Sequence, residues 1–248
     1  MTLNEVRREL DKANNELLAC LLKRLNLSAD VADIKLKSGT KIFCPEREAA
    51  IFESIKAQSG DMYAYTEPIF RSAIEASKQY QRDIIKNSIS IALIGMPGSG
   101  KTGLGKMAAA KLKRAFFDTD VICENMSGLK SGEYILKNGE EAFRLLEARA
   151  LEAAFKQPGV VVATGGGAVL RAENRELIKR SARVYHITRP LNALALAGRP
   201  LSKNLNELEK ERLPIYTELC DISISNTETP EDAANKILLD FEAYIAGL

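Results

Sequence analysis

The residues best placed to do chemistry form a loop that begins at Gly95 and reads Gly-Met-Pro-Gly-Ser-Gly-Lys-Thr. It follows the apolar run 89–94 and precedes a helix-forming segment, which is the context that a phosphate-binding loop requires. The glycines let successive backbone N–H groups point into one concavity at a helix N-terminus, where phosphate is favoured. An ordinary glycine-rich turn would need neither the lysine nor the hydroxyl. The pattern therefore predicts a nucleoside triphosphate site made of Gly98, Ser99, Gly100, Lys101, Thr102 and Gly103.

Strand-like and helical segments alternate after this loop. The expected strands are 115–117, 159–163, 183–187 and 221–225, and the expected helices include 140–156, 172–180, 204–219 and 230–246. This alternation predicts a parallel α/β sheet of five strands, counting the run before the loop, with ligands bound at the carboxyl ends of the strands.

Several polar groups fall at those strand ends. Asp118 and Asp120 follow the second strand, and the glycines 165–167 follow the third. Three arginines also fall in this part of the chain: Arg144 early in a helix, Arg199 in a loop, and Arg212 before a Pro-Ile-Tyr segment. Taken singly, each of these features is more often structural than functional, as a turn, a surface charge or a helix-end cation.

Taken together, these features resemble shikimate kinases in order and spacing over about residues 89–248. The resemblance rests on the phosphate loop, Asp118-x-Asp120, Gly-Glu-Glu-x-Phe-Arg144, Ala-Thr-Gly-Gly-Gly-Ala-Val at 163–169, Gly-Arg-Pro-Leu at 198–201 and Arg212-x-Pro-x-Tyr. The triple glycine and the Phe-Arg pair disfavour the alternative of a P-loop kinase for another small polyol acid. One departure is the apolar segment 191–198, which is shorter than the arginine-rich lid of relatives and predicts weak nucleotide binding.

The resemblance also implies roles for individual residues. Arg144 and Arg212 would hold the carboxylate of shikimate, helped by backbone N–H groups of Gly165, Gly166 and Gly167, because a planar guanidinium suits a carboxylate. Asp120 would bind the ring hydroxyls and orient the attacking one. Thr102 and Asp118 would hold Mg²⁺. Lys101 and the lid residue Arg199 would stabilise the phosphoryl group that ATP donates.

The first 88 residues show a different pattern. Apolar residues recur at a 3-4 spacing from Leu3 onward, and no glycine or proline occurs before Gly39. This predicts one helix of about 35 residues, followed by shorter helices at 45–59 and 65–87. So long a helix overshoots a small domain and must bury its apolar stripe elsewhere. We therefore expect a homodimer in which the long helices cross or swap.

One position of this seam carries a cation where packing would favour an apolar residue. Arg24 occupies it, and Lys35 lies only about 20° further around the helix. Two inward cations are costly unless an anion lies between them; otherwise Arg24 extends to the surface or pairs with Glu48. Arg7 is about 25 Å from Arg24 along the helix, so it would serve a second site, in a dimer partner.

The series Arg7, Arg24, Val-Ala-Asp-Ile-Lys35, Pro-Glu-Arg47-Glu48 and Ser77-x-x-x-Gln81 resembles the all-helical chorismate mutases over nearly all of residues 1–85. The resemblance implies a helix-swapped dimer. Arg7 of one protomer would join Arg24 and Arg47 of the other on the two carboxylates of chorismate, with Ser77 close to a carboxylate. Lys35 and Gln81 would bind the ether oxygen, and Glu48 a hydroxyl. Such a Claisen rearrangement needs fixed donors and no nucleophile.

A departure at Cys44, where relatives commonly carry aspartate, leaves a second hypothesis open. In that hypothesis, residues 1–88 form a non-catalytic dimerisation or regulatory module for the kinase. On either hypothesis we expect a helical domain at residues 1–87 and a kinase domain at 88–248. The preferred prediction is a bifunctional enzyme.

Composition limits the partners of the chain. The formal net charge of the 248 residues is +2 and is evenly spread, which argues against binding to nucleic acid. No run of 18 apolar residues occurs, so no membrane partner is expected. The four cysteines are scattered without a C-x-x-C pair, and the first residues lack the apolar core of a secretory signal. These features predict a cytoplasmic protein with reduced thiols.

Overall fold

The structure is a computed structural model that describes residues 1–38, 40, 42–194 and 205–248. The chain forms two compact units. The first contains Met1–Lys86 and Tyr244–Leu248, and the second contains Asn87–Ala243. The functional boundary expected between residues 87 and 88 stays a prediction. The expected lid residue Arg199 lies outside the described residues.

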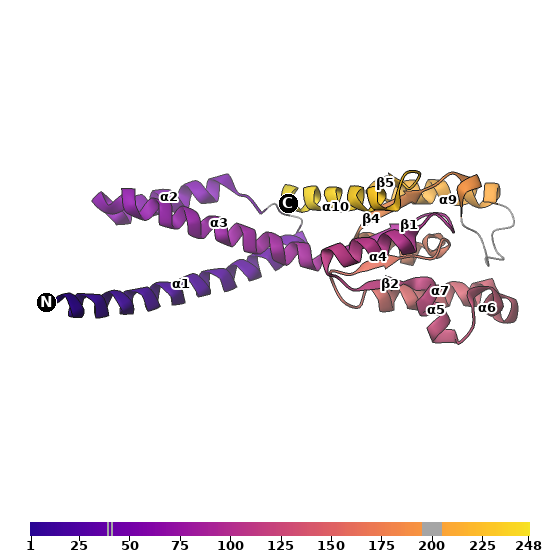
Figure 1. Cartoon of the computed structure of the whole chain (residues 1–248), viewed down its shortest axis with the longest axis horizontal. Helices are drawn as coiled ribbons and strands as arrows, with labels where there is room; N and C mark the ends of the chain where they lie inside the picture. The colour runs from indigo at the N-terminus through magenta and orange to yellow at the C-terminus, as the bar shows by residue number, and fades with distance from the viewer. Residues whose placement is uncertain (39, 41, 195–204) are drawn as a thin grey trace. The chain divides into compact units, whose positions relative to one another are not determined.

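The first unit is helical, as predicted. Its helices are α1 (Leu3–Ser38), α2 (Pro45–Ser59) and α3 (Tyr63–Ser88), with a short 3-10 turn (Gly60–Met62) before α3 (Figure 1). Proline at the first position of α2 has no N–H to leave unsatisfied, and two glutamates in the first turn favour the positive end of the helix. The third helix begins two residues earlier than expected because the 3-10 turn leads directly into it.

The long helix α1 is largely uncovered within one chain. All of residues 1–20 are exposed, and its buried residues are Ser28 and Ala32. Figure 1 shows the first half of α1 lying apart from α2 and α3. Its exposed apolar side chains include Leu3, Val6, Leu10, Leu17, Leu18, Leu22 and Leu27. An apolar stripe of this length on a water-exposed helix requires another surface to cover it.

The second unit is built on a parallel sheet with the strand order β2-β3-β1-β4-β5. Every strand pair in it is parallel, and the predicted five-stranded sheet is confirmed. The central strand, β1, leads directly into the phosphate loop, and all five of its residues are buried. The strands are β1 (Ser90–Ile94), β2 (Phe116–Asp118), β3 (Val161–Ala163), β4 (Ala182–Thr188) and β5 (Ile222–Ser225).

Helices connect and cover these strands. Three of them, α5 to α7, pack on one another at the β2 end of the sheet (Figure 1). Two of these, α5 and α6, are short helices that the sequence reading does not list. No helix among the described residues is long and apolar enough to cross a membrane. The helices are α4 (Lys101–Leu112), α5 (Thr119–Ser127), α6 (Ser131–Asn138), α7 (Glu140–Ala154), α8 (Ala172–Ser181), α9 (Leu205–Leu219) and α10 (Pro230–Gly247).

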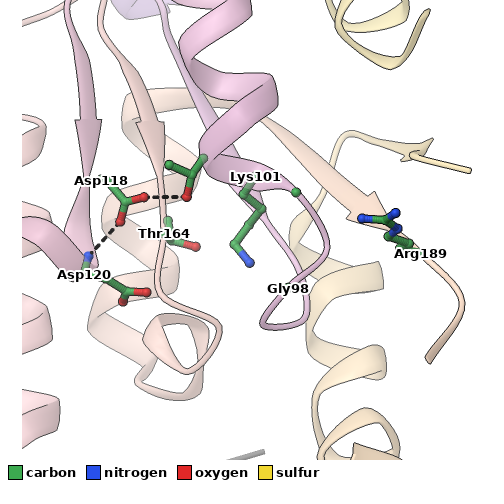
Figure 2. A pocket seen from close by; sticks show the side chains of 8 residues that line it. Gly98, Lys101, Asp118, Asp120, Thr164 and Arg189 are labelled. Carbon is green, nitrogen blue, oxygen red and sulfur yellow. Dashed lines mark hydrogen bonds between the residues drawn. The ribbon is translucent and has the colours of Figure 1, made fainter. Parts of the chain in front are cut away.

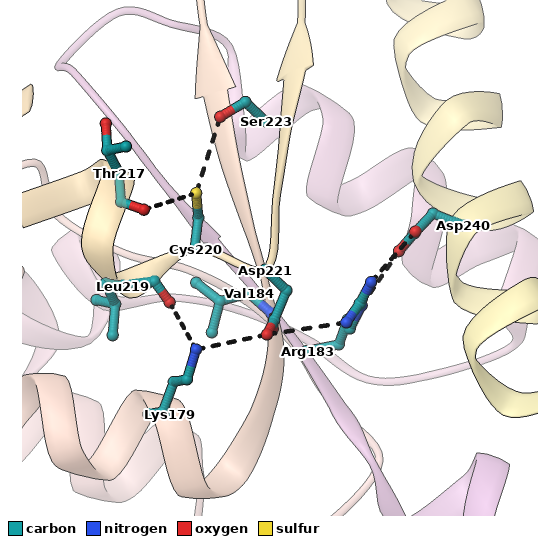
Figure 3. Close-up of polar contacts among 9 residues, drawn as sticks. All are labelled: Lys179, Arg183, Val184, Thr217, Leu219, Cys220, Asp221, Ser223 and Asp240. Carbon is teal, nitrogen blue, oxygen red and sulfur yellow. Dashed lines mark hydrogen bonds and ion pairs between the residues drawn. The ribbon is translucent and has the colours of Figure 1, made fainter. Parts of the chain in front are cut away.

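A network of charged residues joins β4 to its neighbours. Asp240 of α10 accepts from Arg183 Nε at 3.2 Å and from the Tyr185 hydroxyl at 2.7 Å. Asp221 accepts from the backbone N–H of Val184 at 2.7 Å and pairs with Lys179 at 3.5 Å (Figure 3). Burial and the hydrogen bond to Asp240 raise the pKa of Tyr185, so its hydroxyl stays protonated and donates. The network fixes α10 and the start of β5 against β4.

We predict that Asp240→Ala lowers stability by about 3 kcal/mol, because the Tyr185 hydroxyl loses its acceptor and Arg183 keeps only the longer ion pair with Asp221 at 3.8 Å. In thermal unfolding of the full chain this corresponds to a fall in Tm of about 6–12 °C. Leu239→Ala is the matched control, since that neighbouring side chain is 72% exposed. Equal Tm values for the two variants would show that the network contributes nothing to stability.

Candidate active site

The phosphate loop has the geometry that its glycines predict. Gly95, Gly98 and Gly100 have φ angles of 139°, 80° and 100°, which side chains other than glycine rarely adopt. Lys101 opens α4 and is buried. Its Nζ donates to the carbonyls of Gly95 at 2.8 Å and Met96 at 2.9 Å. The ammonium group is thus held inside the curl of the loop, where the phosphates of a nucleotide would enter.

Two side chains with oxygen atoms that could bind a metal ion lie together beside the loop. The Thr102 hydroxyl donates to Asp118 Oδ2 at 2.6 Å, and Asp118 Oδ1 accepts from the backbone N–H of Asp120 at 3.0 Å (Figure 2). Asp118 is the N-cap of α5, so the helix fixes its carboxylate. A hydroxyl and a carboxylate at this distance form a donor set that fits Mg²⁺. Among the described residues, no group of three or more His, Cys, Asp or Glu side chains is arranged to hold a metal ion.

The loop, the Asp118–Asp120 segment and the ends of β3 and β4 enclose one pocket. Its lining residues are Gly98, Gly100, Lys101, Thr102, Asp118, Asp120, Thr164 and Arg189 (Figure 2). The sequence reading predicted six of these as site residues and missed Thr164 and Arg189. Their positions in the sequence could have indicated both residues. Each directly follows the last residue of a strand, at the edge of the sheet where ligands bind.

A buried ion pair lies next to this pocket. Arg144 Nη1 donates to Glu147 Oε2 at 2.5 Å, and Nη2 donates to Glu140 at 2.7 Å. Glu147 is only 2% exposed, whereas the side chain of Glu140 is 63% exposed. Burial raises the pKa of Glu147, while the neighbouring Arg144 acts to lower it. The sequence reading missed Glu147, although its place three residues after Arg144 on one helix face indicates such a pair.

The three consecutive glycines allow these charged groups to approach the backbone. A Cβ on Gly165 would lie 2.6 Å from Asp120 Oδ1 and 2.7 Å from Glu147 Oε1, and one on Gly167 would collide with the Arg144 guanidinium. The segment therefore brings Asp120, Arg144 and Glu147 to one place. A side chain at Gly165 or Gly167 would fill the space that these three groups use.

Arg212 reaches the same region from α9. It is 6% exposed, and its Nε has no hydrogen-bond partner among the described residues. One turn later, the Tyr216 hydroxyl donates to the Gly166 carbonyl at 2.6 Å and so ties α9 to the glycine segment. Burial raises the pKa of Tyr216 to about 12, so the hydroxyl remains a donor. A buried guanidinium N–H without a partner is costly unless a ligand completes it.

In the helical unit, some of the predicted residues come together between α1 and α3. Arg24 Nε donates to Ser77 Oγ at 3.1 Å, and Ser77 is 3% exposed. One turn along α3, Gln81 is 8% exposed, and its Oε1 has no hydrogen-bond partner in the part of the chain that the structure describes. The alternative in which Arg24 pairs with Glu48 is not what the structure has, because Glu48 pairs with Lys78 at 3.0 Å. The sequence reading did not single out Lys78.

Other predicted residues of this unit do not join that cluster. Lys35 Nζ donates to the carbonyl of Ile42 at 2.6 Å. Arg47 is exposed on α2, and Arg7 is exposed in the uncovered first half of α1. Arg24 and Ser77 also line a largely apolar pocket with Leu21, Leu25, Pro68, Ile69, Ser72, Ala73 and Ala76. Within one chain, the helical unit therefore provides only part of the predicted site.

Comparison with known proteins decides the family. The shikimate kinase family model matches residues 97–242, more than half of the chain. The chain belongs to the shikimate kinase family. The chorismate mutase type II model matches residues 6–82, which confirms the predicted order of the two families in one chain. This is the organisation of a bifunctional shikimate-pathway enzyme that uses ATP.

Individual relatives agree with this assignment. The chain is 34% identical over 167 residues to shikimate kinase of Psychrobacter cryohalolentis, which covers 62% of this chain and 90% of the relative. It is 35% identical over 171 residues to that of Thermodesulfovibrio yellowstonii, covering 64% and 98%. Among solved structures, shikimate kinase from Acinetobacter baumannii in complex with shikimate is 31% identical with a TM-score of 0.62, covering 66% of this chain and 98% of that one.

We predict that Glu147→Gln raises the KM for shikimate about tenfold and leaves the KM for ATP unchanged. The substitution keeps the size of the side chain but removes the charge that orients the buried Arg144 guanidinium. Glu140→Gln is the matched control, since its exposed pair with Arg144 should contribute little. An equal rise in both KM values, or an equal effect of the two variants, would contradict the positioning role of Glu147.

Proposed function

We propose that the second unit transfers the γ-phosphoryl group of ATP to a hydroxyl of shikimate, with the triphosphate in the loop and shikimate beside the glycine segment. The observation that carries this proposal is the cluster of the partly buried Arg144 with the buried Glu147 and Arg212, beside a pocket that contains Lys101 and Asp120. One buried and one partly buried arginine suit an acceptor that carries a carboxylate. The match to the shikimate kinase family and the shikimate complex of the Acinetobacter enzyme support this substrate.

The chemistry is an in-line displacement. The shikimate hydroxyl oxygen forms a bond to the γ-phosphorus as the bond to the β–γ bridging oxygen breaks, and ADP leaves. Asp120 orients this hydroxyl and accepts its proton. Lys101 stabilises the negative charge that develops on the transferring group and on the leaving oxygen, because its ammonium is fixed inside the loop. Arg144 and Arg212 hold the acceptor in the reactive position.

Thr102 and Asp118 are the residues that would hold Mg²⁺. When bound, this ion would neutralise phosphate charge and fix the geometry of the triphosphate. The protein contributes the Thr102 hydroxyl directly and the Asp118 carboxylate, whose position is set by its capping bond to α5.

For the first unit, we propose a chorismate mutase site that is completed by the α1 helix of a second copy of the chain. The uncovered apolar stripe of α1 supports dimerisation. The exposed position of Arg7 suits a residue that acts in the partner's site. Arg24, Ser77 and Gln81 form the part of the site that one chain supplies, and the unpartnered Gln81 Oε1 marks a buried polar atom that needs a ligand or a rearrangement.

This site would act by holding chorismate in its reactive conformation. Arg7, Arg24 and Arg47 would bind the two carboxylates, and Glu48 a hydroxyl. Lys35 would donate to the ether oxygen as the C–O bond breaks and the new C–C bond forms. Since Lys35 donates to the Ile42 carbonyl in this structure, it would exchange that bond for one to the substrate.

One observation favours the second candidate function, a non-catalytic dimerisation module. Cys44 is the N-cap of α2, and its side chain makes no capping hydrogen bond. Aspartate, which the resemblance to chorismate mutases leads us to expect there, would cap the helix and fix the residues that follow. Residues 45–48 carry Arg47 and Glu48, so a loosely fixed helix start would weaken the mutase site.

The four free cysteines fit our proposal of a cytoplasmic location.

We predict that Lys101→Ala and Arg24→Ala separate the two activities. Lys101→Ala should lower shikimate-dependent ADP release by about 100-fold or more and leave chorismate consumption intact, and Arg24→Ala should do the reverse. ADP release is measured by a coupled assay with shikimate, gluconate and AMP, and chorismate loss by absorbance. A wild type that releases ADP with gluconate but not with shikimate would contradict the substrate, and one that consumes no chorismate would establish the dimerisation module.

We predict that mixed dimers restore mutase activity from two inactive variants. If Arg7 acts across the dimer, one site of an Arg7→Ala/Arg24→Ala hybrid carries both changes and the other carries neither. Random mixing after mild denaturation should then recover about a quarter of wild-type mutase activity. Two Arg24→Ala samples mixed in the same way form the control. Recovery no greater than the control would show that both arginines belong to the same chain's site.

A further inference from the structure

Arg189 lines the nucleotide pocket, and the proposed reaction assigns it no role. Of the eight residues that line this pocket, Lys101 and Arg189 are the two cations. In Figure 2 the loop around Gly98 lies between Lys101 and Arg189, and the carboxylates of Asp118 and Asp120 lie on the far side of Lys101. Arg189 forms no ion pair or hydrogen bond with another described residue that would neutralise or anchor its guanidinium. It is partly buried.

The backbone of Arg189 is fixed relative to the phosphate loop. The residue follows Thr188, the last residue of β4, and precedes Pro190, which restricts it to extended conformations. The Thr188 carbonyl accepts from the backbone N–H of Asn226 at 2.9 Å. The Asn226 side chain in turn donates from Nδ2 to the Ser99 carbonyl at 2.8 Å. Two hydrogen bonds therefore link the end of β4 to the loop through the end of β5.

This linkage depends on a close approach at Gly100. A Cβ on that glycine would collide with the Asn226 amide, so the glycine that gives the loop its curl also admits the side chain that anchors it. Asn226 is buried, and its amide nitrogen is satisfied by the loop carbonyl. These contacts hold the segment that follows β4 close to the phosphate loop. Arg189 is the first residue of that segment.

We propose that Arg189 is a nucleotide-binding residue that contacts the phosphate chain of ATP from the wall opposite the carboxylates. The proposal rests on the nucleotide site proposed above and adds a binding residue to it. A triphosphate carries more negative charge than one lysine and one divalent cation neutralise, and a guanidinium presents paired donors that match phosphate oxygens. Mg²⁺ at Thr102 and Asp118 would neutralise phosphate charge on one wall, and Arg189 is a cation on the opposite wall of the same pocket.

The test measures binding without turnover. Titration calorimetry of the full chain with ADP and with inorganic triphosphate, each with Mg²⁺, should show affinities about tenfold lower for Arg189→Gln than for the wild type. Arg189→Lys should recover part of the loss, since the charge remains but the paired geometry does not. Adenosine should bind both proteins equally. Arg180→Gln is the matched control, because that arginine is exposed at the end of α8.

Kinetics then separate this proposal from the proposed function. Arg189→Gln should raise the KM for ATP about tenfold and change the KM for shikimate less than twofold. Unchanged affinity for both phosphate ligands would overturn the proposal, and so would a loss confined to adenosine, which would place the guanidinium on the base instead. A wild type that binds ADP but fails to phosphorylate shikimate would refute the proposed substrate, while the calorimetry would still decide the role of Arg189.

Discussion

The kinase unit depends on one constraint, that charge buried beside its glycine segment must be matched by opposite charge. Glu147 is almost fully buried and is approached by Arg144, with Asp120 and Arg212 also influencing its pKa. Two guanidinium groups and two carboxylates in a small space balance one another only in a narrow set of positions. The backbone there must be glycine, because a Cβ would occupy the space of these side chains. An acceptor carboxylate would enter a site whose cations are already oriented.

In the helical unit, buried charged and polar groups are only partly matched by partners. Arg24 is partnered by a serine hydroxyl and not by a carboxylate, and the nearby Gln81 Oε1 is buried without a partner. The apolar stripe of α1 is exposed along its first half. Each of these features is unfavourable in an isolated chain, and a second copy with a dianionic ligand would relieve all of them. The dimer proposed above would thus account for both the incomplete packing and the incomplete charge pairing.

Much of this organisation could be predicted from the sequence because the deciding features are local. The phosphate loop, the period of α1 and the run of strands each depend on neighbouring residues, and their predicted bounds differ from the observed ones by a few residues. The resemblance to shikimate kinases implied that Asp118 and Thr102 hold a metal ion together. In the structure their side chains share a 2.6 Å hydrogen bond, and the metal site stays a prediction.

The residues that were missed depend on contacts between distant segments. Asn226 meets the phosphate loop only because β5 is placed two strands away from β1, and no local pattern encodes that order. Lys78 takes Glu48 as its partner through the packing of α3 on α2, where spacing alone suggested Arg24. Glu147 was accessible to sequence reasoning in principle, yet its importance lies in its burial, which depends on the whole unit.

The central claim is that oriented, buried arginines select an acceptor by its carboxylate. The most direct measurement compares kcat/KM for shikimate with that for its uncharged carboxamide, in the wild type and in Arg144→Gln. The account predicts that the wild type prefers shikimate by about 100-fold or more, and that most of this preference disappears in the variant because both acceptors then lack the paired guanidinium. A wild type that phosphorylates the carboxamide as efficiently as shikimate would contradict it.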